Sequence, residues 1–366
     1  MKYLKSITLI LALAFFACTA AFAEGHGEEA EKEGISLKEI LFGHVQDSYN
    51  WHLFDVEGHP VVIDLPMIFY SQQSGFHVLC SSQFEHHPNA ELLREGPEGF
   101  AIQGSAEEKG KIVEQVNGEW QPVCFDISIT KQVCVVFIDA IILLLCILIP
   151  ARWCKKHKID DEAPKGFTGL MHMFIMSVYD DLIKSTLGEK ADKYAPYLLT
   201  CFFFIFFANL MGVMPFPPGG GNITGNIAIT GFLALCTFLV TNVTGNKHYW
   251  MEVFWPEVPT WLKCPVPLMP LIELFGVFIK PIVLCVRLFA NMLAGHAIAI
   301  SLTCMIFIMF AIGGFMGNLL GGFITPVSVL MSIFMMALEL LVCYIQAMVF
   351  TLLSAIYIQM SHATHH

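Results

Sequence analysis

The segment ELFGVFIKPIVLCVRLFANMLAGH, residues 273–296, places charged side chains inside a long apolar run. Glu273, Lys280 and Arg287 follow one another at intervals of seven residues. Seven residues turn a helix by about 700°, so each side chain lies only about 20° from the last. His296 comes nine residues after Arg287, about 900° of rotation, and therefore points to the opposite side. Because charges inside lipid are costly and usually functional, the segment predicts a membrane helix with a functional polar stripe.

The composition of the whole chain also indicates a membrane protein. Hydrophobic residues make up 55% of the 366 positions, charged residues 14%, and the mean hydropathy is +0.63. A soluble domain of this length carries more charge on its surface. The net charge of −11 excludes a basic nucleic-acid-binding surface as the main function. We therefore expect a chain solvated largely by membrane lipid, with no nucleic-acid partner.

Apolar runs outside this segment complete an expected all-α membrane domain, residues 131–366, with about five transmembrane helices. A span needs roughly 20 apolar residues. Three spans precede the segment: Val133 to Pro150, Tyr194 to Val213 and Asn226 to Val243. Between the first two, the stretch from Phe167 to Gly188 is amphipathic with internal charges, which predicts a helix on the cytoplasmic surface.

Basic residues set the expected orientation. Arg152, Lys155, Lys156 and Lys158 follow the first span, and such clusters mark the cytoplasmic side of a membrane. The loop between the second and third spans has no Lys or Arg, which agrees with a position outside. The chain before the first span is then exported, and after five crossings the C-terminus is cytoplasmic.

The last two spans predict a long, strongly tilted antiparallel hairpin. Their apolar stretches run from Pro270 to Gly313 and from Pro326 to Ile358. At 1.5 Å per residue the first is about 65 Å long, roughly twice the hydrocarbon thickness, so it cannot stand upright in a bilayer. We expect the chain to turn between them at a group of glycines: Gly313, Gly314, Gly317, Gly321 and Gly322.

Folding this hairpin brings polar residues of its two helices level with one another. Counted from the glycine turn, Arg287 and Gln346 are nearly equidistant, and so are His296 and Glu339. Simple interhelical pairing is one explanation of the second pair. It does not explain Arg287, because a guanidinium does not lose its proton and no carboxylate of this chain is expected level with it. We therefore expect its anionic partner on another polypeptide.

The first 23 residues are typical of a secretory signal peptide. Lys2 and Lys5 precede an apolar run from Ile7 to Phe16, and Ala21-Phe22-Ala23 forms a small-x-small cleavage site. A retained first helix is one alternative, but the apolar run is short for a span. A lipid-modified Cys18 is another, but Phe15-Phe16-Ala17 before it fits that processing site poorly.

Residues 24–130 predict a small exported region that is β-rich in its second part. Short apolar runs follow one another from Trp51 to Ile129. Asn117-Gly118 separates two of these runs, which is typical of a two-residue hairpin. Three histidines, His77, His86 and His87, lack a repeated ligand spacing, so we expect solvent-exposed side chains and no metal site.

Cysteine usage does not indicate a disulfide scaffold. Most of the 12 cysteines sit in apolar stretches, where the thiol behaves as a small hydrophobe. Cys80 and Cys124 lie in the expected exported region, where a disulfide can persist. The sequence leaves their pairing open.

The segment from Pro281 to His296 strongly resembles the signature of the subunit a family of F-type ATP synthases. That family shows an Arg-Leu-Phe-x-Asn-x-x-Ala-Gly core, here Arg287 to Gly295. The resemblance extends upstream through Glu273 and Lys280, downstream from Gln346 to Tyr357, and to the stretch 226–230. From Val133 onward the order of elements fits the family, whereas the exported region is longer than usual and is not covered.

The resemblance implies roles for individual residues. Arg287 resembles the stator arginine that faces the ionisable carboxylate of the rotating ring. His296 and Glu339 match two positions of the proton inlet half-channel, with acid and histidine exchanged relative to many bacterial members. The remaining matches are polar residues that flank the arginine, Asn291 and Gln346, and candidate linings of the half-channels, Glu273, Lys280 and Asn226.

The resemblance also implies a bacterial inner-membrane, multi-pass subunit that carries protons and binds no cofactor or metal. It would not be catalytic, since ATP chemistry belongs to other subunits. Its partners would be a ring of c subunits, b-type peripheral stalk subunits and the rest of the synthase.

Three other classes of function fit the sequence less well. In a secondary transporter, Arg287 would bind an anionic substrate between helices, but the sequence shows no second copy of the charged hairpin. A sensor or interaction protein would not need three charges on one membrane stripe. No zinc-protease, phosphate-loop or nucleophile motif indicates an enzyme.

Overall fold

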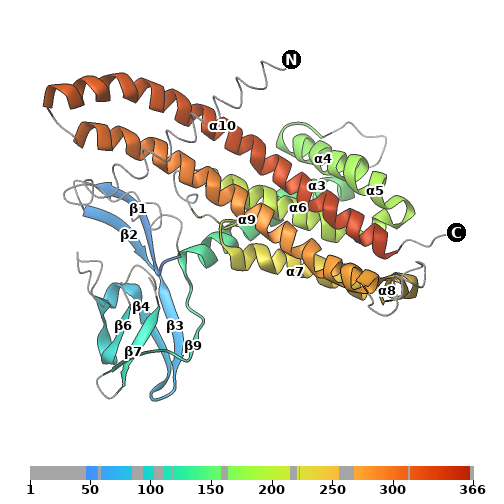
Figure 1. The fold of residues 1–366 in the computed structure, drawn as a ribbon, viewed down its shortest axis with the longest axis horizontal. Helices are drawn as coiled ribbons and strands as arrows, with labels where there is room; N and C mark the ends of the chain where they lie inside the picture. Colours follow the sequence, from blue (N-terminus) through green and yellow to red (C-terminus); the bar gives the residue numbers. More distant parts are fainter. Residues whose placement is uncertain are drawn as a thin grey trace. The chain divides into compact units, whose positions relative to one another are not determined.

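The computed structural model (Figure 1) describes residues 47–56, 59–84, 94–102, 111–116, 119–157, 164–214, 221, 223–254, 268–311 and 314–362. The predicted signal peptide, His86, His87 and the Asn117-Gly118 turn lie outside these residues. By compactness the chain divides into two units. One unit comprises Met1–Gln46 and Ala297–Met336, and the other comprises Asp47–His296 and Ala337–His366.

Small antiparallel sheets form the N-terminal region of the second unit, which confirms the β-rich prediction. Their strands are β1 (Asn50–Val56), β2 (His59–Asp64), β3 (Pro66–Ser71), β4 (Gly75–Cys80), β5 (Arg94–Glu95), β6 (Phe100–Ile102), β7 (Ile112–Val116), β8 (Glu119–Pro122) and β9 (Phe125–Asp126). The sheets have the orders β1-β2, β4-β3-β9 and β5-β6-β7-β8. Val116 pairs with Glu119, so β7 and β8 form the hairpin that Asn117-Gly118 predicts.

The N-terminal region is joined directly to the first membrane helix. Met67 and Phe69, alternate residues of β3, are buried in the core of the N-terminal region, as the period of a strand requires. At its end Thr130 caps α3 (Lys131–Lys156) by accepting a hydrogen bond from the amide of Val133 at 3.4 Å. The amide of Lys131 donates to the carbonyl of Ser48 at 2.9 Å. This hydrogen bond ties the start of the first strand to the start of α3.

A nearly continuous helical stretch follows. It comprises α4 (Phe167–Ser177), the π-helix η4 (Val178–Lys184), α5 (Ser185–Leu187), the 3₁₀ turn η5 (Gly188–Lys190) and α6 (Ala191–Val213). Gly188 has φ of 58°, a conformation that glycine adopts without steric cost. This residue separates the predicted surface helix from the predicted second span.

Two further helices form a sharp bend. α7 (Ile227–Val243) and α8 (Lys247–Phe254) meet at 103°. Among the described residues, four helical stretches are long and apolar enough to cross a membrane, or five if this bent pair counts as one span. This number confirms the prediction of about five spans.

The last two helices are the longest, and most of the glycines expected in the turn between them belong to α10 instead. α9 runs from Leu268 to Ala311 and α10 from Gly314 to Ser361. The glycines at 314, 317, 321 and 322 are therefore helical and open α10, which begins well before Pro326. Glycine weakens helices in water, yet it is common in transmembrane helices, where small residues allow close packing.

Aromatic packing around α6 holds the helices of the second unit together. Phe174 of α4 meets Phe202 and Phe203 of α6 edge-on at 5.6 and 5.4 Å between ring centroids. Leu284 and Leu288 of α9 are buried in the same cluster. These contacts fix which face of α9 is covered and which face stays open.

Candidate functional site

His296 of α9 and Glu339 of α10 form a largely buried acid–base pair. Histidine Nδ1 lies 3.1 Å from carboxylate Oε1, and the two side chains are only 15% and 9% exposed. The distance is that of an ion pair, but the angles do not make a hydrogen bond: within the described chain, Oε1 has no hydrogen-bond partner. Imidazole and carboxylate groups are the side chains that most often relay protons in proteins.

Two glycines allow the helices to approach this pair. A Cβ atom added to Gly295 would lie 2.9 Å from Glu339 Oε1, and one added to Gly212 of α6 would lie 3.4 Å from His296 Nε2. Larger residues at either position would press on the pair. The site therefore lies where α6, α9 and α10 meet.

The register of α9 against α10 is antiparallel, as the sequence predicts. His296 meets Glu339, and sixteen residues earlier on α9 the ammonium of Lys280 lies 5.5 Å from the ring centroid of Tyr357, further along α10. Figure 1 shows the two helices side by side in orange and red. One predicted pair, His296 with Glu339, is thus in direct contact.

Arg287 differs from the pair in its surroundings. It is exposed on α9, whereas Gln346 is buried on α10, and no hydrogen bond or ion pair joins Arg287 to another residue in the described part of the chain. Its neighbours Val283 and Val286 are exposed as well. A guanidinium on an apolar membrane surface needs an anionic partner, and none lies beside Arg287 among the described residues.

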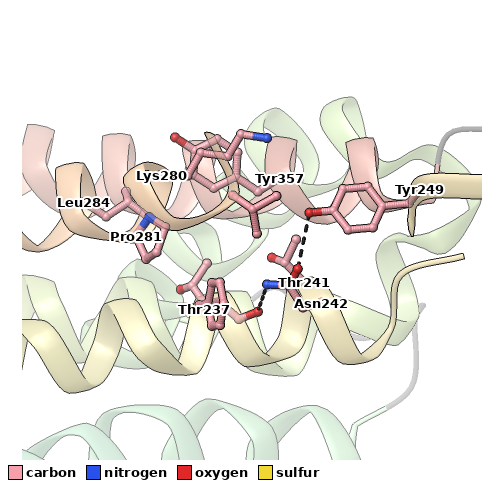
Figure 2. A pocket seen from close by; sticks show the side chains of 10 residues that line it. Thr237, Thr241, Asn242, Tyr249, Lys280, Pro281, Leu284 and Tyr357 are labelled. Atoms are coloured by element: carbon pink, nitrogen blue, oxygen red, sulfur yellow. Dashed lines mark hydrogen bonds between the residues drawn. The ribbon is translucent and has the colours of Figure 1, made fainter. Parts of the chain in front are cut away.

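The other residues of the predicted stripe have different environments. Glu273 and Asn291 are exposed on α9. Lys280 is half-buried and borders a small cavity (Figure 2). The stripe that helical geometry predicts is therefore not uniform, because neighbouring helices cover only part of it.

This cavity lies between α7, α8, α9 and α10. Its free space, about 20 Å³ for the centres of water molecules, is sufficient for a water molecule. In Figure 2 the hydroxyl of Tyr249 donates to Asn242 at 3.3 Å, and Asn242 donates to the carbonyl of Phe238 at 2.8 Å. The lining residues are Thr237, Phe238, Thr241, Asn242, Tyr249, Val277, Lys280, Pro281, Leu284 and Tyr357.

Asn226 lies at the N-terminus of α7, where it holds two helices. Its Oδ1 accepts a hydrogen bond from the amide of Ala228 at 2.9 Å and caps the helix. Its Nδ2 donates to Oε1 of Gln132 on α3. Asn226 thus positions the start of α7 against α3, whether or not it also lines a half-channel.

Two buried polar side chains, on α3 and α6, are not among the predicted site residues. Asp139 of α3 and Asn209 of α6 are both fully buried. The signal for Asp139 was present, since it is the one carboxylate within the apolar run from Val133 to Pro150. Asn209 had no such signal, because asparagine occurs in many apolar helices.

The histidines and cysteines of the N-terminal region form no second site in the part that the structure describes. His77 packs against Phe69 and Phe100, with ring centroids 5.8 and 4.9 Å apart. No group of three potential metal ligands occurs among the described residues. Cys80 and Cys124 carry free thiols.

The fold and site together define a multi-pass membrane protein in which an exposed arginine stands between two polar sites along one long helix. Comparison with known proteins agrees with this class. The family described as ATP synthase A chain matches residues 133–359, and a domain of unknown function, DUF8433, matches residues 40–127.

Two curated relatives cover most of the same chain. ATP synthase subunit a of Chloroherpeton thalassium is 39% identical over 243 residues, 65% of this chain and 68% of the relative. Subunit a of Myxococcus xanthus is 37% identical over 249 residues, 66% of this chain and 76% of the relative. The chain belongs to the ATP synthase subunit a family. It is a non-catalytic membrane subunit of the F-type ATP synthase complex, the stator subunit with the proton channel.

Proposed function

We propose that Arg287 faces the ionisable carboxylate of a c-subunit ring, between two offset half-channels that this chain supplies. The observation that carries the proposal is the position of Arg287 between two polar sites on α9. The cavity beside Lys280 lies seven residues before it and the His296–Glu339 pair nine residues after it, about 10 and 14 Å along the helix. Within the described residues, no hydrogen bond or ion pair joins either site to Arg287.

Electrostatics gives this arrangement a mechanism. A ring carboxylate in lipid is stable when protonated, because desolvation penalises its charged form. Opposite Arg287 the charged form is favoured, so the proton leaves there. Because Arg287 keeps its own charge, it prevents protons from passing straight between the half-channels. Each proton that crosses the membrane gains about 2.3 kcal/mol per 100 mV, which biases rotation and couples proton flow to ATP synthesis.

The proton inlet is assigned to His296 and Glu339, and the outlet to the cavity beside Lys280. A proton would reach the His296–Glu339 pair, ride the ring and leave past the cavity. Asn291, exposed one turn from Arg287, and Gln346, buried on α10, would flank the arginine. The other expected linings are Glu273, exposed towards the start of α9, and Asn226 at the start of α7.

The orientation and partners are part of the same proposal. Lys155 and Lys156 lie in the last turn of α3, and such residues favour the cytoplasmic side. The N-terminal region is then exported, the C-terminus cytoplasmic, and the chain sits in a bacterial inner membrane. Besides the ring, b-type peripheral stalk subunits are the expected partners. The expected division of the chain is a signal peptide 1–23, an exported region 24–130 and a membrane domain 131–366.

The proposal is tested by ATP-driven acidification of inverted vesicles that carry Arg287→Ala. We expect the complex to assemble and proton pumping to fall by about a hundredfold or more, since the variant removes the charge that discharges the ring. The matched control is Arg152→Ala, which removes an exposed arginine near the C-terminal end of α3. This variant should pump normally. Pumping by an assembled Arg287→Ala complex at the control rate would contradict the assignment.

A further inference from the structure

Asp139 is a fully buried carboxylate that the proposed path does not yet use. It lies on α3, eight residues after Lys131, about 12 Å along the helix from its start. The side chain is 0% exposed, and neither carboxylate oxygen has a hydrogen-bond partner among the described residues. Buried polar groups are nearly always hydrogen-bonded, and an ionisable group inside a membrane span is costly. An arrangement that costs stability needs a reason.

The face of α3 that carries Asp139 is turned towards the other helices and away from lipid. Gln132, Val135 and Asp139 are the buried residues in the first part of α3, and their spacing places them on one stripe. Gln132 accepts a hydrogen bond from Asn226 of α7. Val135 is buried in a cluster with Ala208 of α6. Asp139 follows one turn deeper on the same face.

A second unpartnered polar group lies beside this stripe. Asn209, next to Ala208 on α6, is 0% exposed. Its Oδ1 accepts from the hydroxyl of Thr224 at 2.6 Å, but its Nδ2 has no hydrogen-bond partner within the described chain. Two buried polar side chains with unused hydrogen-bonding capacity, on two helices that pack together, form a place where water can be held.

The stripe connects to the acid–base pair through α6. Gly212 lies three residues after Asn209, on nearly the same face, and its Cβ position would be 3.4 Å from His296 Nε2. Polar groups therefore continue from Gln132 and Asn226, at the ends of α3 and α7, past Asp139 and Asn209 to His296.

We propose that Asp139 is a proton-relay residue of the inlet half-channel, placed ahead of the His296–Glu339 pair. Its carboxylate takes a proton from water on the N-terminal side of α3. The O–H bond then breaks as the proton passes, through water, to His296, and the carboxylate is ready for the next proton. The inference rests on the proposed function, since it assumes that protons reach the ring through this pair.

The experiment compares proton pumping of assembled complexes in inverted vesicles. Asp139→Asn keeps the shape of the side chain and removes its titratable proton, and we expect pumping about tenfold slower. Asp139→Ser, smaller and also neutral, takes its place if the asparagine variant does not assemble. Asp139→Glu should recover at least about half of the wild-type rate, because a carboxyl group is restored. Thr351→Val removes another fully buried oxygen, on α10, that has no hydrogen-bond partner among the described residues, and it should pump normally.

The outcomes separate this inference from the function on which it rests. Wild-type pumping by the neutral variants, or equal slowing by Asn and Glu, would overturn the relay role and leave Asp139 a purely structural residue. Glu339→Gln is measured in the same membranes. If Glu339→Gln is slow while Asp139→Asn is normal, only the inference about Asp139 fails; if Glu339→Gln pumps normally, the proposed inlet itself is wrong.

Discussion

Gly295 shows how a single missing side chain shapes the acid–base pair. A Cβ atom there would lie 2.9 Å from Glu339 Oε1 and 3.2 Å from its Cδ. The atoms that it would meet belong to the end of a flexible side chain, so the helices can stay in place while the carboxylate moves. The missing side chain of Gly295 therefore matters for the position of the Glu339 carboxylate and much less for the stability of the helix pair.

We expect Gly295→Ala to slow ATP-driven proton pumping by about tenfold or more, since small displacements of reacting groups are costly. Assembly of the complex should be unchanged, as judged by the amount of purified complex. Gly276→Ala is the matched control, because it lies on the same helix with nothing within 4 Å of the added Cβ. Equal pumping by the two variants would show that Glu339 does not need its present position.

At the scale of elements, α7 depends on one residue for its start and for its tie to α3. Asn226 caps α7 with its oxygen and reaches Gln132 with its nitrogen. Asn226→Ala loses both bonds, whereas Asn226→Asp keeps the acceptor for the cap and loses the donor. The loss of a cap costs about 1 kcal/mol, which accelerates hydrogen exchange roughly fivefold.

Hydrogen exchange at the first turn of α7 measures this prediction. We expect the amides around Ala228 to exchange faster in Asn226→Ala than in Asn226→Asp, and Asn226→Asp to stay close to the wild type. If both variants exchange alike, the link to Gln132 matters more than the cap.

The sheets of the N-terminal region depend on a phenol–carboxylate contact. The hydroxyl of Tyr49 donates to Asp126 Oδ2, next to the pairing of β9 with β3. Burial, followed by this hydrogen bond, raises the pKa of Tyr49 above its ordinary value of 10.0. The neutral phenol therefore stabilises the folded state fully below pH 10, and this contribution is lost as the pH rises from there towards the folded pKa.

Tyr49→Phe removes this contribution, and we expect it to lower the stability of the region by about 1 kcal/mol at neutral pH. Hydrogen exchange of β3 in the intact complex should be faster in the variant at pH 7. The difference in exchange rate between the variant and the wild type should shrink above pH 10, where the wild type loses the stabilisation from its neutral phenol. A difference that grows with pH would contradict the role of the neutral phenol.

For the whole molecule, the important contact joins the N-terminal region to the membrane helices. Trp51 of β1 is buried in one cluster with Val135 of α3, Ala208 of α6 and Ile223. This cluster lies one turn from Asp139 on α3. The N-terminal region therefore covers the end of the helices at which the proposed proton inlet begins.

Trp51→Ala should loosen this cover, because removing a buried tryptophan costs about 3 kcal/mol or more. We expect limited proteolysis to cut between the N-terminal region and α3 faster in the variant, while the membrane helices stay protected. Tyr70→Ala, which removes an exposed aromatic side chain of β3, is the control and should be cut at the wild-type rate. Unchanged cleavage of Trp51→Ala would mean that the cluster does not hold the two parts together.

The sequence by itself determined what depends on local pattern. Apolar runs predicted the spans, and the short runs with Asn117-Gly118 predicted the strands and a hairpin. The spacing of polar residues on two helices predicted that His296 meets Glu339. These features follow from the period of a helix or strand and from the cost of charges in lipid, which need no knowledge of neighbouring elements.

Only the tertiary structure decided which polar groups are covered and which are open. Arg287 and Lys280 share a stripe in sequence, but α7 and α10 cover Lys280 and leave Arg287 exposed. Asp139 is fully buried without a hydrogen bond to any described residue, because the helices that pack on α3 cover its face. The glycines at 314, 317, 321 and 322 are helical, although glycine is a weak helix former in water. Burial depends on contacts between distant parts of the chain, and a local pattern does not contain them.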